Sequence, residues 1–383
     1  MSEKKSQELI IKDAQSLNIH FSKSTSLKNT TLQDIDLNAF PIDWTQIEIK
    51  NTTFLGCKMN IEQEIRLREK GATIFIAQNH LPYKPYRKGL YTWQELMEGY
   101  SPVEDNCLDL KIYKHFSTTR FKPTVKEALY QRIHDHAIDD ALRQLIPFDE
   151  NGMSTRRCVG IMGGHNILRD NPFYEKTVKT AKILTENGYF IASGGGPGIM
   201  EAANLGAYFA GRSKGELREA LKILKKAPSF RDHNYLETSQ EVLKKFPEGQ
   251  ENLAIPTWFY GHEPSNLFAS HIAKYFSNSI REDTLLAVSL YGIIFAPGSA
   301  GTTQEIFMDA AQNHYGTYNY YSPMVFLGKQ RYEIDTMIFP LLKQLSWNKE
   351  YHKLLYLTDE PKKVLKFLKK NPPILNAGDL SET

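Results

Sequence analysis

The stretch of residues 295–305, Phe-Ala-Pro-Gly-Ser-Ala-Gly-Thr-Thr-Gln-Glu, constrains the fold more than any other part of the chain. The apolar run before it, residues 291–296, predicts a buried parallel strand, and apolar residues after Glu305 recur at helical spacing. A strand that turns through glycines into a helix leaves backbone N–H groups free at the positive end of the helix dipole, where a phosphate binds well. The stretch alone would favour a plain strand-to-helix turn. The candidate anion-binding residues are Gly298, Ser299, Ala300, Gly301 and Thr302.

A second stretch, residues 191–204, has the same order of strand, glycines and helix. Its three consecutive glycines permit positive φ angles and a close approach of backbone to a ligand. It is not a dinucleotide fingerprint, because that motif has glycine at its sixth position and the sixth position counted from Gly194 is Ile199. The chain also has no Gly-Lys-Ser/Thr of a Walker phosphate loop. Two such turns, each with one acidic residue, suggest a mononucleotide bound at a phosphate end and a sugar end. The candidate residues of this turn are Gly194, Gly195, Gly196, Gly198, Met200 and Glu201.

Gly-Gly-Gly-Pro-Gly-Ile-Met-Glu-Ala-Ala-Asn followed by Pro-Gly-Ser-Ala-Gly-Thr-Thr-Gln-Glu resembles the LONELY GUY (LOG) family of nucleotide 5′-monophosphate phosphoribohydrolases. The resemblance covers residues 157–345 and implies a Rossmann-like α/β fold. It also implies hydrolysis of a purine or modified purine nucleoside 5′-monophosphate to free base and ribose 5-phosphate, a homodimer or larger assembly, and no cofactor or metal. The family's usual Pro-Gly-Gly-x-Gly-Thr has Ser299 at its second glycine here, which leaves open an altered ligand.

The resemblance assigns roles to two charged residues. Breaking an N-glycosidic bond passes through an oxocarbenium-like state, so the enzyme needs negative charge near C1′ and a means to activate water, and such general-base help is worth roughly 10²- to 10⁴-fold. By resemblance Glu305 has this role, and Arg281 is the candidate for the family's catalytic arginine on the preceding helix. Counted back from Pro297, the family's usual spacing places its arginine at the position of Glu282, and Arg281 lies one residue farther from Pro297. The alternative for Arg281 is a surface ion pair.

Two other functions remain open at this point. A nucleotide sensor without catalysis fits the same scaffold, because fold alone does not fix function. A partner-binding module in the first 150 residues would make the nucleotide site auxiliary. Nothing in the sequence identifies the base.

Residues 151–383 predict the Rossmann-like domain. A strand over 158–162 ends at Gly163, Gly164 and His165, and a helix and a second strand follow before the glycine turn. This β-α-β-α order implies a parallel sheet flanked by helices, with ligands at the carboxyl ends of the strands. His165 there is either a ligand contact or a loop histidine. Aromatic residues within 257–266 either stack on a base or fill the core, and residues 265–288 predict a long apolar helix.

The first 150 residues differ in composition. Residues 1–60 predict a β-rich segment in which inward-pointing residues recur every fifth position, as in a pentapeptide-repeat β-helix, and a chance run of short strands is the alternative. Those positions are Leu27, Leu32, Leu37, Ile42, Ile47, Thr52 and Cys57. Residues 61–150 predict a mainly helical connection with helices over 92–99 and 125–145, and His134 and His136 fall on different sides of the second helix.

Charge and cysteine content exclude several classes. A net charge of +3 over 383 residues provides no basic field for nucleic acid. Three widely spaced cysteines form neither a disulfide framework nor a metal cluster and fit a reducing compartment. The start has no apolar signal segment, and no apolar run approaches a membrane span. We expect a cytoplasmic protein.

Overall fold

The computed structural model describes residues 8–40, 42–78, 80–102 and 106–376. The chain divides into two compact units, Met1–Gly89 with Lys122–Ala141 and Leu90–Phe121 with Leu142–Thr383. These limits differ from the boundaries expected at residues 60 and 150. Residues 90–121 pack with the C-terminal sheet, where Tyr91 pairs in antiparallel fashion with Ile272. No helix within the described residues is long and apolar enough to cross a membrane.

The larger unit is built on a seven-stranded, wholly parallel sheet, as the alternation of strands and helices predicts. The chain starts in the middle of this sheet, adds three strands on one side and then three on the other. In spatial order the strands are β12 (Leu355–Thr358), β11 (Met324–Leu327), β9 (Ile293–Phe295), β5 (Cys158–Met162), β6 (Phe190–Ser193), β7 (Leu253–Ala254) and β8 (His271–Ile272). The direction of winding reverses between β5 and β9, and ligands of such sheets bind at this switch point.

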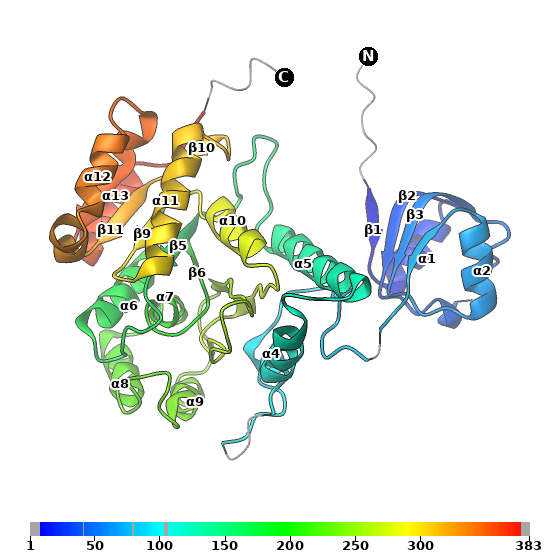
Figure 1. Ribbon diagram of the computed structural model, residues 1–383, viewed down its shortest axis with the longest axis horizontal. Helices are drawn as coiled ribbons and strands as arrows, with labels where there is room; N and C mark the ends of the chain where they lie inside the picture. The colour runs from blue at the N-terminus through cyan, green and yellow to red at the C-terminus, as the bar shows by residue number, and fades with distance from the viewer. Residues whose placement is uncertain (1–7, 41, 79, 103–105, 377–383) are drawn as a thin grey trace. The chain divides into compact units, whose positions relative to one another are not determined.

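Helices cover both faces of the sheet. On one face α6 (Pro172–Thr185), α7 (Ile199–Tyr208) and α13 (Pro361–Lys370) bury their apolar sides against the strands. On the other face α10 (Asn278–Val288) and α11 (Ala300–Tyr315) lie side by side (Figure 1). Asn171 caps α6 through its side chain and Pro172 occupies the first turn, as the sequence predicts. The mixed α/β, Rossmann-like fold expected from the sequence is confirmed.

The remaining elements of this unit are short or peripheral. They are α3 (Trp93–Leu96), α4 (Leu108–Thr119), α8 (Lys214–Leu224), α9 (Tyr235–Lys245), β10 (Tyr320–Tyr321), a π-helical turn (Gln330–Asp335), α12 (Ile338–Leu345), a 3₁₀ turn (Glu350–Leu354) and β13 (Ile374–Leu375). The expected helix over 265–288 is wrong in its first half. Residues 265–277 form a loop and β8, and their apolar residues Leu267, Phe268 and Ile272 are buried within this chain.

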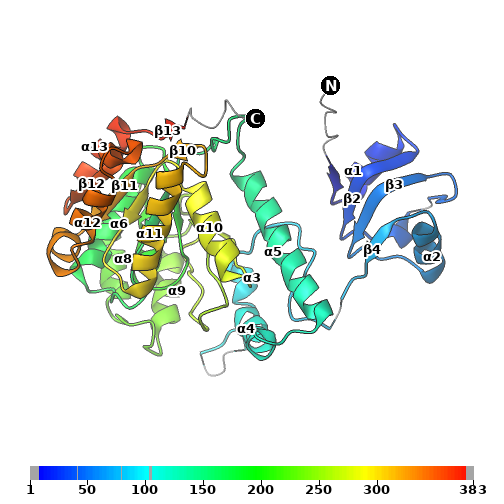
Figure 2. The same cartoon turned by 45° about the horizontal axis from the view of Figure 1, so that its top comes forward.

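The smaller unit contains a four-stranded parallel sheet in the order β1-β2-β3-β4, with helices in two of its connections (Figure 2). Its elements are β1 (Leu9–Ile11), α1 (Ala14–Phe21), β2 (Ser26–Gln33), a 3₁₀ turn (Leu37–Ala39), β3 (Glu48–Leu55), α2 (Ile61–Glu69), β4 (Thr73–Phe75) and most of α5 (Val125–Leu145). The residues at every fifth position are buried except for the half-buried Ile42. A pentapeptide coil is nevertheless not formed, because two eight-residue strands, β2 and β3, joined through a 3₁₀ turn occupy the range of these positions.

The repeat of this unit is 22 residues long. Thr30 pairs with Thr52 and Leu32 with Phe54, so the two copies of Lys-Asn-Thr-Thr in the sequence lie side by side. Asn29 and Asn51 have φ angles of 49° and 48°, and the Asn51 amide donates to the Asn29 side chain over 2.8 Å. Stacked asparagines that tolerate positive φ thus put the same bend into both strands.

The histidines of α5 lie in different environments. His134 is buried edge-on against Tyr83 and beside Asp135, whereas His136 lines a cavity of about 190 Å³ near Asp140. Within the described residues no group of three or more His, Cys, Asp or Glu side chains is placed to hold a metal. Cys57, Cys107 and Cys158 are buried, and none of the three is in a disulfide.

Candidate functional site

A cavity of about 540 Å³ opens at the carboxyl ends of the central strands, at the switch point between β5 and β9. Its size lies within the range of pockets that bind small molecules. Most residues singled out in the sequence line it. These are Gly163, Gly164, His165, Gly194, Gly195, Gly196, Met200, Arg281, Ser299, Ala300, Gly301, Thr302 and Glu305.

The N-terminus of α11 forms one end of the cavity. Ser299 precedes the helix, and its side chain makes no capping hydrogen bond. Among the described residues, no hydrogen bond uses the N–H groups of Ala300, Gly301 or Thr302. Gly298 lies behind this end rather than on it, because a Cβ there would come within 2.0 Å of Oγ1 of Thr302. Free N–H groups at the positive end of the dipole make this end suited to an anion.

The three-glycine turn before α7 forms the adjoining wall. Gly195 and Gly198 have φ angles of 76° and 67°, which explains why glycine stands at both positions. Gly198 does not line the main cavity, since the Gly164 carbonyl lies 2.4 Å from where its Cβ would be. The N–H of Ile199 donates to that same carbonyl over 3.1 Å. The start of α7 is thus partly satisfied by protein, which makes α11 the better anion site.

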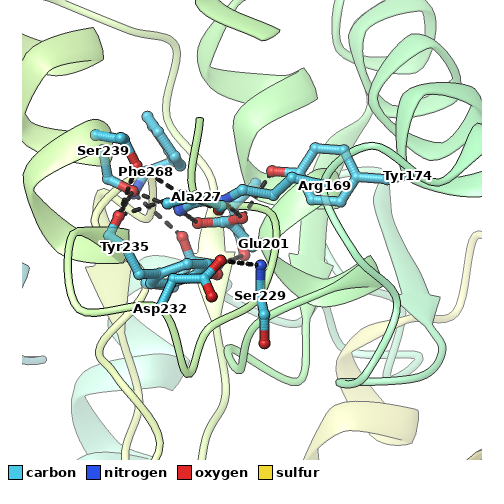
Figure 3. A network of polar contacts seen from close by, with 12 residues as sticks. Arg169, Tyr174, Glu201, Ala227, Ser229, Asp232, Tyr235, Ser239 and Phe268 are labelled. Carbon is cyan, nitrogen blue, oxygen red and sulfur yellow. Dashed lines mark hydrogen bonds and ion pairs between the residues drawn. The ribbon is translucent and has the colours of Figure 1, made fainter. Parts of the chain in front are cut away.

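Glu201 does not reach the cavity, in contrast to the sequence-based expectation. Glu201 is 3% exposed. Its carboxylate accepts two hydrogen bonds from Arg169, one from Nε to Oε2 over 2.8 Å and one from Nη2 to Oε1 (Figure 3). The Tyr174 hydroxyl donates to the same carboxylate over 2.7 Å, and the guanidinium lies 3.5 Å from the centre of the Tyr235 ring. The second acidic residue of the motifs therefore joins the β5–α6 loop to α7 and α9 instead of holding a sugar.

Arg281 and Glu305 face each other within the cavity. Nη1 of Arg281 lies 3.5 Å from Oε1 of Glu305, and the Arg281 side chain is fixed by donating Nε–H to the Ile255 carbonyl over 2.8 Å. The Glu305 side chain is 15% exposed. Burial raises the pKa of Glu305 from 4.5 to about 7, Arg281 opposes this rise, and the Glu282 charge adds to it. Glu305 is thus placed to accept a proton near neutral pH.

Glu282 also lines the cavity but makes different contacts. Its carboxylate accepts hydrogen bonds from Asn278 at 2.7 Å and from Gln304 at 2.9 Å, and the Tyr260 hydroxyl lies 3.4 Å away. Arg281, not Glu282, is therefore the residue of this pair that meets Glu305. The surface ion pair considered for Arg281 is not observed, because its side chain is buried.

In the sequence, the wall opposite α11 was indicated only by the aromatic residues within 257–266. It is formed by residues after β7 and around β8, which carry no glycine motif and come together only in the folded chain. These residues are Pro256, Thr257, Tyr260, Gly261, Glu263, Pro264, Ser265, Asn266, Ile272 and Lys274. Trp258 fills the core and is fully buried, whereas the 66% exposed Tyr260 lines the cavity, where stacking on a base stays a prediction.

Comparison with solved structures found proteins of low sequence identity and low TM-score. Neither the protein-family models nor the curated proteins gave a match. A molybdenum cofactor binding protein from the phototrophic bacterium Rippkaea orientalis is 15% identical with a TM-score of 0.35, over 56% of this chain and 96% of that chain. A Moco carrier protein from Chlamydomonas reinhardtii is 13% identical with a TM-score of 0.34, over 56% of this chain and 99% of that chain.

Proposed function

We propose that the larger unit hydrolyses the N-glycosidic bond of a nucleoside 5′-monophosphate, releasing ribose 5-phosphate and the free base, as the resemblance to the LOG family implies. One observation carries the proposal. A carboxylate with a pKa of about 7, Glu305, lies one turn behind a helix N-terminus with free N–H groups and 3.5 Å from a buried arginine. An anion site and a proton acceptor at this spacing suit a phosphorylated sugar.

In the proposed reaction the phosphate binds at the N–H groups of Ala300, Gly301 and Thr302. The bond between C1′ and the base nitrogen breaks while water adds to C1′. Ionised Glu305 stabilises the developing positive charge on the sugar, accepts one proton from the water, and passes it on so that the base leaves protonated. Arg281 keeps the Glu305 carboxylate oriented toward the sugar.

Ser299 marks a departure that bears on the alternative of a nucleotide sensor. A serine still presents its backbone N–H at the start of α11. Its hydroxyl makes no capping hydrogen bond to the helix, so the hydroxyl is open to a ligand. The close approach of Arg281 and Glu305 favours the enzyme over the sensor, because binding alone does not require a carboxylate of raised pKa beside an arginine.

The test is incubation of the purified chain with AMP, GMP, IMP and CMP, following release of ribose 5-phosphate. We expect at least one substrate to be cleaved. Glu305→Gln keeps the shape of the side chain and removes its charge, so turnover should fall about 10²-fold or more while binding persists. The exposed Glu333→Gln is the matched control and should behave as the wild type.

Two results would contradict the proposal. Absence of release from every monophosphate, with binding retained, would favour the sensor. Full activity of Glu305→Gln would refute the role of this carboxylate.

Calorimetry adds a separate check, since AMP should bind more tightly than adenosine if the α11 N-terminus holds phosphate. The homodimer that the resemblance implies is tested by light scattering at micromolar concentration, where a monomeric mass would rule it out.

A further inference from the structure

The wall of the cavity opposite α11 is a loop of residues 258–265. Tyr260, Gly261, Glu263, Pro264 and Ser265 of this loop line the cavity, and the loop forms no helix or strand. It comes close to the three-glycine turn, since a Cβ on Gly196 would lie 2.6 Å from the Glu263 carboxylate. The position of this loop therefore determines the width of the cavity.

One carboxylate, Asp109 on α4, holds both ends of this loop. Its Oδ1 accepts the Trp258 indole N–H over 2.7 Å, and its Oδ2 accepts the Ser265 hydroxyl over 2.7 Å. The ammonium of Lys274, which also lines the cavity, lies 2.8 Å from Oδ1 and 2.9 Å from Oδ2. Asp109 is 1% exposed, so these protein groups replace water as its partners.

The same segment of the chain contacts the loop once more. Arg120, which follows α4, donates from Nη1 to the Phe259 carbonyl over 2.5 Å. Burial alone would raise the pKa of Asp109, but Lys274 beside it lowers that pKa below its ordinary value. The carboxylate is thus charged at neutral pH, and hydrogen bonds to a charged acceptor are the strong ones.

We propose that Asp109 is a positioning residue of the cavity: it ties the start and the end of the 258–265 loop to Lys274 and so fixes the wall against which the ligand binds. Asp109 lies outside the segment that carries the glycine motifs and is not among the residues that line the cavity. Its effect on the KM for a monophosphate rests on the proposed function, whereas its effect on the loop does not.

The first test removes the hydrogen bond from Ser265 to Asp109, which we call one end of the tether between Asp109 and the loop. Ser265→Ala in the full-length protein leaves Asp109 paired with Lys274. We expect the backbone amides of Trp258 and Phe259, which donate to the Tyr275 carbonyl and the Thr257 hydroxyl, to exchange hydrogen about 10- to 100-fold faster, the factor that corresponds to losing a hydrogen bond to a charged acceptor. The control is Ser270→Ala, which removes a serine bonded to Asn252 rather than to Asp109 and should leave exchange at these two amides unchanged.

The second test removes the carboxylate's charge. Asp109→Asn alone strands the buried Lys274 charge and risks unfolding, so it is combined with Lys274→Met, which removes both charges. The double variant should also exchange faster at the amides of Trp258 and Phe259. With a cleavable monophosphate, KM should rise about tenfold for Ser265→Ala while kcat changes little, because the loop positions the ligand without taking part in bond breaking.

The outcomes separate this proposal from the proposed function. Unchanged exchange in both variants would overturn the tether, whatever the enzyme does. Faster exchange combined with unchanged KM would overturn the positioning role. Faster exchange in a protein that cleaves no monophosphate would support the tether and refute only the proposed function.

Discussion

Glu305→Gln should stabilise the folded protein at alkaline pH. A buried carboxylate whose pKa rises from 4.5 to about 7 binds its proton more tightly in the folded than in the unfolded chain. Between these two values the folded state therefore holds more protons, and the free energy of unfolding falls as pH rises. Glutamine resembles the protonated acid in shape and does not titrate, so the variant escapes this loss.

The magnitude follows from the size of the shift. About 2.5 pKa units at 1.36 kcal/mol each correspond to about 3 kcal/mol of lost stability once Glu305 is ionised in the folded state. We expect Glu305→Gln to match the wild type near pH 4 and to exceed it by about 3 kcal/mol at pH 8 and above. Residues at active sites commonly carry such a cost in stability.

Urea unfolding followed by tryptophan fluorescence at several pH values measures this difference. The exposed Glu333→Gln controls for loss of a negative charge at the surface and should show no pH-dependent gain. Equal or lower stability of Glu305→Gln at pH 8, or a difference that does not vary with pH, would refute the assigned environment of Glu305.

Further predictions concern pH, the buried ion pair and the extent of the folded unit. The kcat/KM for a cleaved monophosphate should fall below a pH of about 7 as Glu305 is protonated. Glu282→Gln should move the midpoint of this fall to lower pH, because the Glu282 charge helps to raise the pKa of Glu305. A pH-rate profile checks both. Arg169→Met should cost about 3–5 kcal/mol in urea unfolding because Glu201 is left buried without its partner, whereas Lys226→Met, which breaks an exposed pair, should cost at most about 1 kcal/mol. A fragment of residues 151–383 lacks Asp109 and should aggregate on size-exclusion chromatography, and elution as a compact monomer would contradict the division into units.

Local patterns in the sequence were enough for the elements around the site. The helix over 125–145 and the strand over 158–162 have the expected limits, because apolar spacing and turn residues act within a few positions. Glycines in the two turns followed from the backbone conformations that the turns require. Arg281 and Glu305 were named from the resemblance, and the structure brings them within 3.5 Å of each other.

The failures share one cause, which is that partners distant in sequence decided the outcome. Residues 265–277 have the apolar content of a helix, yet they form a loop and β8, paired with β7 and with Tyr91. The sequence pattern did not predict the 22-residue repeat, because the same segment also has buried residues at every fifth position.

The sequence by itself thus determined the parallel α/β architecture and the two glycine turns, since each depends on neighbouring residues, and the family resemblance of its motifs named Arg281 and Glu305. Only the tertiary structure decided that Glu201 pairs with Arg169, 32 positions away, and that Asp109 meets Ser265, 156 positions away. A carboxylate's role depends on whether its partner is a ligand, an arginine or a loop. That partner is set by the packing of whole elements, which no local pattern encodes.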